Sequence, residues 1–277
     1  MNDASTPPRP DLAGLWVRVR LHRSEGDDLA VVEEEAGWAA RLVTPRWFAQ
    51  WHLPRCTDAI RPLPLHQLSA AELAGLARQV AHVGCMQVEA HAEGELCHWL
   101  RHADYQPPGA PSESGWLLFE SPSRVVDVHV HDEDSSVWDV AFALTGSAQA
   151  AAFCLAGLDA EGGEDGRLLL ASGAHLAYHR PRRACWPAGL RSGLSLVDVL
   201  LHRPDEAQVW LDHELSLARW ASGRCEVLHS TLPEQRGQIA AFAARRTQTD
   251  QAWVRWRDQE GPWRVLDWHG SDDAYAV

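Results

Sequence analysis

Short segments in which apolar and polar residues alternate run through most of the chain. Residues 12–22 show this period of two, which is typical of a strand with one buried face. Glycine, proline, aspartate and serine separate the segments and predict turns between them. The further predicted strands are 29–34, 37–43, 44–54, 85–91, 95–106, 115–120, 124–131, 136–144, 148–156, 166–172, 174–180, 207–220, 225–232, 252–258 and 263–269. Many short strands favour an all-β antiparallel barrel or sandwich.

One stretch has the pattern of a well-capped helix. Ser69 is suited to the N-cap, and Glu72 three residues later completes a capping box. Apolar residues then recur at helical spacing, and Gly84 follows them. We therefore expect one α-helix near 70–82 that covers an end of the sheet, and a shorter helix over 195–201.

The chain has no proline- or glycine-rich linker that would mark a domain boundary. Residues 1–11 are polar and proline-rich, which predicts a loose arm, and residues 271–277 predict a disordered tail. Between them, 12–143 and 144–270 each contain a set of strands. The pattern is compatible with two fused barrel-like halves and with one composite barrel.

Composition and charge exclude several classes of protein. The 277 residues carry a net charge of −13, whereas nucleic-acid binding needs a basic face. There is no apolar run of about 18 residues that would span a membrane, and the first residues lack a secretion signal. We expect a cytoplasmic protein whose partner is a small molecule, with no nucleic acid and no membrane.

Motif searches narrow the chemistry further. The six cysteines are widely spaced without a CxxC pair, which argues against a zinc ribbon or a redox motif and favours reduced thiols. There is no GxSxG elbow, P-loop or GxGxxG. Serine hydrolases, NTPases and Rossmann enzymes are therefore excluded, and we expect no organic cofactor.

The stretch 97–108 holds the densest run of aromatic, basic, acidic and amide side chains. It reads as a strand that ends at Pro107-Pro108. Residues two apart in a strand share a face, so Trp99 and Arg101 point the same way. Fourteen tryptophans against three tyrosines also suit wide interior gaps or an aromatic-lined pocket.

Several motifs resemble one family. Gly14-Leu15-Trp16 resembles the Gly-x-Trp signature of the lipocalin and calycin superfamily. Residues 99–108 resemble a W-x-R-x-x-D-F-Q-P-P block of a poorly characterised lipocalin-like group of bacterial proteins, with Tyr105 at the aromatic position. Residues 44–54, 211–216 and 230–237 are similar to its other blocks. The resemblance implies a calycin-like antiparallel β-barrel with an internal cavity, and it implies no particular activity.

A candidate site follows if these strands surround one cavity. In the predicted strand 207–220, Asp212 and Glu214 share a face, and one arrangement places Arg101 opposite them. The alternative is a structural salt bridge. The candidate catalytic residues are Arg101, Asp104, Glu214 and His52. The candidate ligand-binding residues are Trp99, Gln106, Trp47, Trp51, Trp138 and Asp212.

A second cluster suggests a metal. His129 and His131 lie two apart on one predicted strand face, as zinc, iron or copper ligands often do, and Asp132, Glu133 and Asp134 follow. The alternative is an exposed acidic hairpin tip with surface histidines.

Four functions are compatible with these features, of which the last is a structural interaction module with a filled core. The first is binding of a small, largely apolar or aromatic molecule in the barrel cavity. The second is an isomerase, cyclase or lyase without an organic cofactor, in which Arg101 stabilises negative charge and Asp104, Glu214 or His52 transfers the proton. The third is a metal-dependent enzyme on His129 and His131.

Overall fold

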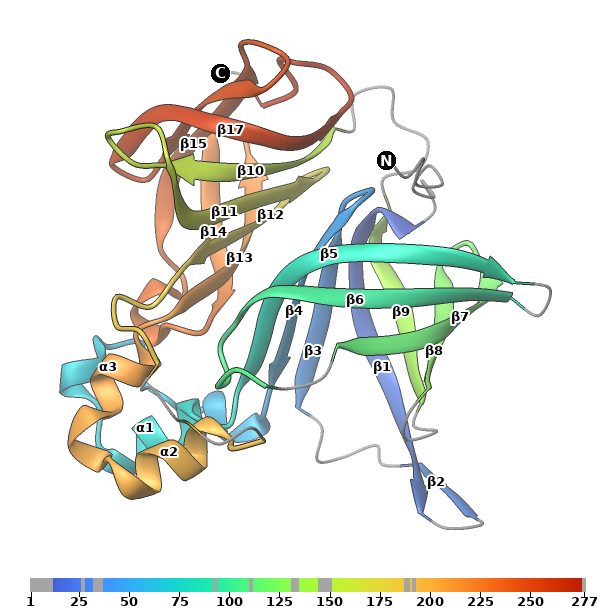
Figure 1. The fold of residues 1–277 in the computed structure, drawn as a ribbon, viewed down its shortest axis with the longest axis vertical. Coiled ribbons are helices and arrows are strands. Elements are labelled where there is room, and N and C mark those ends of the chain that lie inside the picture. Colours follow the sequence, from blue (N-terminus) through green and yellow to red (C-terminus); the bar gives the residue numbers. More distant parts are fainter. Residues whose placement is uncertain are drawn as a thin grey trace.

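Two closed antiparallel β-barrels, each of eight strands, lie side by side in the computed structural model (Figure 1). The structure describes residues 12–25, 28–31, 37–91, 94–109, 112–130, 135–143, 151–186, 190 and 193–275. The expected all-β barrel architecture is confirmed, with two barrels in place of one composite barrel. Residues 1–11, the predicted loose arm, lie outside the described ranges.

The first barrel closes where its first strand pairs with its last. β1 and β9 are antiparallel, with Gly14 opposite Ala143, and β2 (Asp28–Val31) pairs with the far end of β1. The barrel strands are β1 (Gly14–Glu25), β3 (Trp38–Val43), β4 (Trp47–Leu53), β5 (Val80–His91), β6 (Gly94–Asp104), β7 (Glu113–Ser121), β8 (Arg124–His129) and β9 (Ser135–Ala143).

The second barrel closes in the same way through β10 and β17, with Ala152 opposite His269. Its strands are β10 (Ala152–Leu158), β11 (Glu164–Ser172), β12 (His175–Arg180), β13 (Glu214–Ala221), β14 (Arg224–Ser230), β15 (Ile239–Arg246), β16 (Gln251–Trp256) and β17 (Gln259–His269). Neighbouring strands follow each other along the chain, so each barrel is an up-and-down meander.

Three short helices gather at one end of the molecule (Figure 1): α1 (Ala70–Leu76), α2 (Leu196–His202) and α3 (Ala207–Leu211). The capping box of Ser69 and Glu72 is confirmed, and Ser195 with Asp198 forms a second one on α2. None of the helices in the described part of the chain is long and apolar enough to cross a membrane.

The predicted end of the first helix is wrong. α1 stops at Leu76, and Val80 begins β5. From there the residues alternate between the two faces of a strand, which overrides the helical spacing. Gly84 lies inside β5 at a register shift, where a Cβ atom would lie 2.0 Å from the Leu100 carbonyl oxygen. This glycine therefore permits close strand approach and does not end a helix.

Two further expectations are corrected. The predicted strand 207–220 begins as α3, and the strand itself starts at Glu214. The predicted disordered tail is folded up to Tyr275, which is buried and bridges to Ala244 of β15. The Tyr275 hydroxyl donates to the carbonyl oxygens of Gly173 and Ala151, and these bonds hold the tail on the second barrel.

The buried apolar residues form three clusters. One fills the first barrel around Phe48, Trp99 and Trp138, and one fills the second barrel around Phe153 and Phe242. The third lies between the barrels and the helices, and includes Trp51, Leu76, Tyr105, Leu196 and Leu215. The barrels therefore share a continuous apolar interface.

Candidate functional site

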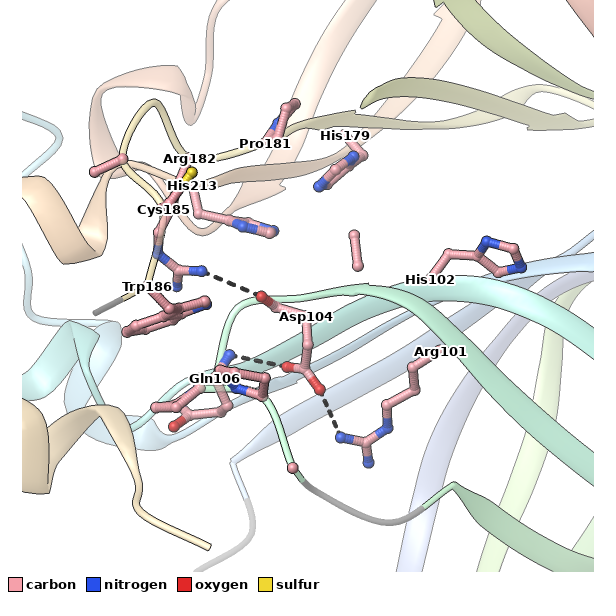
Figure 2. A pocket seen from close by; sticks show the side chains of 15 residues that line it. Arg101, His102, Asp104, Gln106, His179, Pro181, Arg182, Cys185, Trp186 and His213 are labelled. Atoms are coloured by element: carbon pink, nitrogen blue, oxygen red, sulfur yellow. Dashed lines mark hydrogen bonds and ion pairs between the residues drawn. The ribbon is translucent and has the colours of Figure 1, made fainter. Parts of the chain in front are cut away.

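A pocket of about 430 Å³ opens between the two barrels (Figure 2). One wall is the end of β6 with Pro107, Pro108 and Gly109. The opposite wall comes from the second barrel: His179 of β12, the segment 181–186 that follows it, and His213. Residues 101–104 and 106–109 therefore line a pocket, and this pocket lies at the interface between the barrels and not inside one of them.

Gln106 fixes the first wall to the helices. Its side-chain NH₂ group donates to the carbonyl oxygen of Ala77 at 3.0 Å, just after α1. Its side-chain oxygen accepts from the Leu196 backbone N–H at 2.8 Å, at the start of α2. Tyr105 is fully buried beside it, and its hydroxyl donates to the Leu76 carbonyl at 3.1 Å. Hydrogen bonds to α1 and α2 therefore hold the first wall of the pocket in place.

Arg182 joins the two walls. Its guanidinium donates to the carbonyl oxygens of Trp210 (2.5 Å), Asp104 (3.3 Å) and Tyr105, and lies over the Trp186 ring at 4.3 Å. Within the described ranges no carboxylate forms an ion pair with Arg182, although the charges of Asp104 and Asp212 act on its guanidinium from a longer distance. Burial lowers the pKa of Arg182 to about 10, which still leaves a cation at neutral pH.

Two buried histidines form the inner wall. The ring centroids of His179 and His213 are 4.8 Å apart, and the Nε2 atoms of both lack a hydrogen-bond partner among the residues that the structure describes. Nδ1 of His179 lies 3.0 Å from the Gly166 carbonyl oxygen. Burial lowers the pKa of His179 to about 4 and that of His213 well below its ordinary value, with the charge of Arg182 adding to both shifts. Both rings are therefore neutral at pH 7.

Arg101 lies at the edge of the pocket and forms ion pairs with two carboxylates, those of Asp104 and Glu113. It donates to Asp104 at 2.6 Å, and Asp104 also accepts from the Gln106 backbone N–H at 2.8 Å (Figure 2). Arg101 also donates to Glu113. Burial raises the pKa of Asp104, although the Arg101 charge opposes that shift. The charge of Arg101 is thus neutralised by Asp104 and Glu113.

The predicted pairing of Arg101 with Asp212 or Glu214 is wrong. Glu214 is buried in the second barrel, where Arg257 donates to it at 2.5 and 3.2 Å. Asp212 accepts from Arg180 at 2.5 Å. Because residues 207–211 are helical, Asp212 is not part of a strand and does not share a face with Glu214.

The four predicted tryptophans do not share one pocket. Trp99 and Trp138 lie inside the first barrel. Trp47 and Trp51 lie on the outer face of β4, because their side chains alternate with those of Phe48 and Gln50. Trp51 is fully buried between the barrels and donates to the Leu215 carbonyl at 3.0 Å.

His52 belongs to a chain of polar side chains inside the first barrel. Arg41 donates to Asp127 at 3.0 Å and to the Gln50 side-chain oxygen at 2.5 Å. The Gln50 amide nitrogen then faces His52 Nε2 at 2.8 Å and can only donate, so the proton of neutral His52 is on Nδ1. Burial and nearby arginines lower the pKa of His52 well below its usual value.

The metal hypothesis gains no support from the structure. In the part of the chain that the structure describes, no group of three or more His, Cys, Asp or Glu side chains is placed to hold a metal ion. His129 is the last residue of β8, and His131 lies outside the described residues.

Sequence reasoning missed the second wall of the pocket. No sequence pattern brings His179, Arg182 and His213 together, although the segment 180–186 does carry a signal. It combines three arginines, one proline and Trp186 in a non-repeating run after a strand. Its position opposite residues 101–109 depends on how the barrels dock, which no local pattern encodes.

Comparison of the chain with protein-family models, curated proteins and solved structures finds no match.

Proposed function

We propose that the pocket between the barrels binds a small, largely apolar or aromatic molecule that also carries polar groups. The observation that carries this proposal is the pair of buried, unpartnered Nε2 atoms on His179 and His213, beside the unpaired cation of Arg182. Buried polar atoms are almost always hydrogen-bonded in folded proteins. A bound molecule with matching polar groups would satisfy them.

The rest of the pocket fits such a ligand. Its volume of about 430 Å³ lies in the range of small-molecule sites. The lining is largely apolar, with Trp186, Pro107, Pro108 and Ala184 among its residues. The lipocalin-like resemblance also favours a small-molecule binder, although here the site lies between two barrels.

The proposal is tested by filling the pocket. Ala184→Trp places a large side chain in the pocket wall, and Ala160→Trp places the same side chain in the exposed turn after β10 as the control. Native mass spectrometry of freshly purified protein should detect a retained organic molecule in the wild type and in Ala160→Trp, but not in Ala184→Trp. Equal retention in all three proteins would place the molecule elsewhere. Stoichiometric metal in a parallel elemental analysis would support the metal hypothesis instead.

A second candidate is an isomerase, cyclase or lyase that uses the same pocket without an organic cofactor. The bond from His179 Nδ1 to Gly166 favours it, because it leaves Nε2 free to accept a proton. Arg182 would stabilise the negative charge that develops on the substrate. Once the retained molecule is identified, His179→Gln should abolish its conversion and keep its affinity within about threefold, since glutamine still accepts a hydrogen bond. A pure carrier would show no conversion in the wild type.

A further inference from the structure

We propose that the ligand of the pocket between the barrels carries a weakly acidic hydroxyl group, as in an enol or a phenol, which donates its hydrogen bond to His179 Nε2 beside Arg182. This inference rests on the proposed binding function of the pocket. It adds the chemical class of the ligand and the atom that recognises it.

The contact with Gly166 fixes the tautomer of His179. The Gly166 carbonyl oxygen, 3.0 Å from Nδ1, can only accept a hydrogen bond, so Nδ1 must carry the proton. In a neutral imidazole the other nitrogen then presents a lone pair. His179 Nε2 is therefore an acceptor, and it is buried without a partner. Figure 2 shows the ring directed into the space between the two walls.

Two arginines set the charge around that acceptor. The arginines whose charges lower the pKa of His179 are Arg180, which is paired with Asp212, and Arg182, which has no ion-pair partner among the described residues. An ammonium ligand would be repelled by Arg182, and a carboxylate ligand has no proton to donate. The group that fits is a neutral donor.

The cation of Arg182 favours a hydroxyl group over other neutral donors. When a hydroxyl donates to Nε2, negative charge builds up on its oxygen, and a nearby cation favours that charge. Arg182 is a cation that lacks an ion-pair partner among the described residues. A weakly acidic hydroxyl on a planar, conjugated system gains most from this field, and the apolar lining by Trp186, Pro107 and Pro108 suits such a system.

The test uses a matched pair of probes, 2-naphthol and 2-methoxynaphthalene. They share the naphthalene ring and the oxygen, but the ether has a methyl group in place of the hydroxyl hydrogen and cannot donate. Naphthol is protonated at about pH 7.5 because phenols ionise near 10. Isothermal titration calorimetry at that pH should show naphthol binding about five- to tenfold more tightly than the ether, the range expected for one net hydrogen bond. In His179→Phe this preference should vanish, and the affinity for the ether should stay the same. His202→Gln, an exposed histidine on α2, is the control and should behave as the wild type.

Each outcome decides the matter. Equal binding of both probes to the wild type would overturn the hydroxyl inference and leave the pocket proposal standing. If neither probe binds, the hydroxyl inference and the pocket proposal are both overturned. A preference that survives in His179→Phe would also refute the role of His179. If that variant does not fold, the ¹⁵N resonance of His179 Nε2 in the wild type decides: it should shift on addition of naphthol and not of the ether, and an unchanged resonance would contradict the inference.

Discussion

Arg41 is enclosed by polar and aromatic side chains inside the first barrel. It is 5% exposed, forms an ion pair with Asp127 at 3.0 Å and donates to Gln50 at 2.5 Å. Its guanidinium lies over Trp99 at 3.8 Å and over Trp138 at 4.6 Å. A buried charge is stable only while its partners remain in place. Arg41 is therefore central to the order of this interior.

Replacing Arg41 should be strongly destabilising. Arg41→Met leaves the buried carboxylate of Asp127 unpaired, so we expect the free energy of unfolding to fall by about 3 kcal/mol. The control is Arg255→Ala, which breaks the exposed pair with Glu260 and should cost less than about 1 kcal/mol. Urea unfolding of the three proteins measures both values. Equal losses in the two variants would contradict the structural role of Arg41.

His179 should make the fold sensitive to acid. Burial holds its pKa at about 4, below the value of about 6.5 expected in the unfolded chain. As the pH falls, the unfolded chain takes up the proton first, so stability is lost between about pH 6.5 and pH 4, by about 3 kcal/mol for this residue. His179→Phe should lose less stability over that window than the wild type, whereas His66→Gln, an exposed control, should follow the wild type. Urea midpoints across this pH range provide the measurement, and identical slopes in all three proteins would refute the assignment.

The end of β6 is the element that connects the pocket to the helices. Gln106 accepts from Leu196 and donates to Ala77, so one side chain positions the start of α2 and the end of α1 relative to the same strand. Arg182 then ties this strand end to the second barrel. The first wall of the pocket therefore depends on contacts between elements that are distant in sequence.

Removing the Gln106 amide should loosen this junction. Gln106→Leu leaves the Ala77 carbonyl and the Leu196 N–H without their partner, and we expect a loss of about 2 kcal/mol in the free energy of unfolding. Hydrogen exchange at the first turn of α2 should also become faster. Gln208→Leu, an exposed glutamine on α3, serves as the control. Unchanged exchange in Gln106→Leu would show that α2 is held by other contacts.

Local patterns predicted most of the strands but missed β15 (Ile239–Arg246), and they predicted the helix ends poorly. Alternation of period two survives folding where one strand face points into the barrel and the other reaches solvent, as in β14 and β16. The capping box at Ser69 was recognisable because it is a local device. The apolar run in α3 resembles a strand because a five-residue helix is too short to show its period. The wall at 179–186 could not be predicted, since docking of two barrels is a non-local event.

The molecule as a whole depends on both barrels. The apolar cluster between them contains residues from β3, β4, α1, α2 and β13. Trp51 donates to Leu215 across the interface, and Trp38 stacks on His229 with ring centroids 3.8 Å apart. Arg236 adds hydrogen bonds from the second barrel to the carbonyls of Thr57 and Ile60. The interface is built like a core, which indicates a single folding unit.

Neither barrel should therefore fold stably when it is expressed without the other. Residues 12–143 expressed alone expose Trp51 and its apolar neighbours, and we expect aggregation or no cooperative unfolding. The full chain should unfold in one transition, with coincident curves from tryptophan fluorescence and circular dichroism. Two well-separated transitions, or a stable isolated half, would show that the interface contributes little.

The most direct test of the pocket is a crystal structure of the full chain with 2-naphthol. We expect electron density between the barrels, with the naphthol oxygen within hydrogen-bond distance of His179 Nε2 and the rings near Trp186 and the prolines 107 and 108. Density inside the first barrel beside Trp99 and Trp138 would contradict the location of the site. A pocket without density at saturating naphthol would contradict the proposed binding function itself.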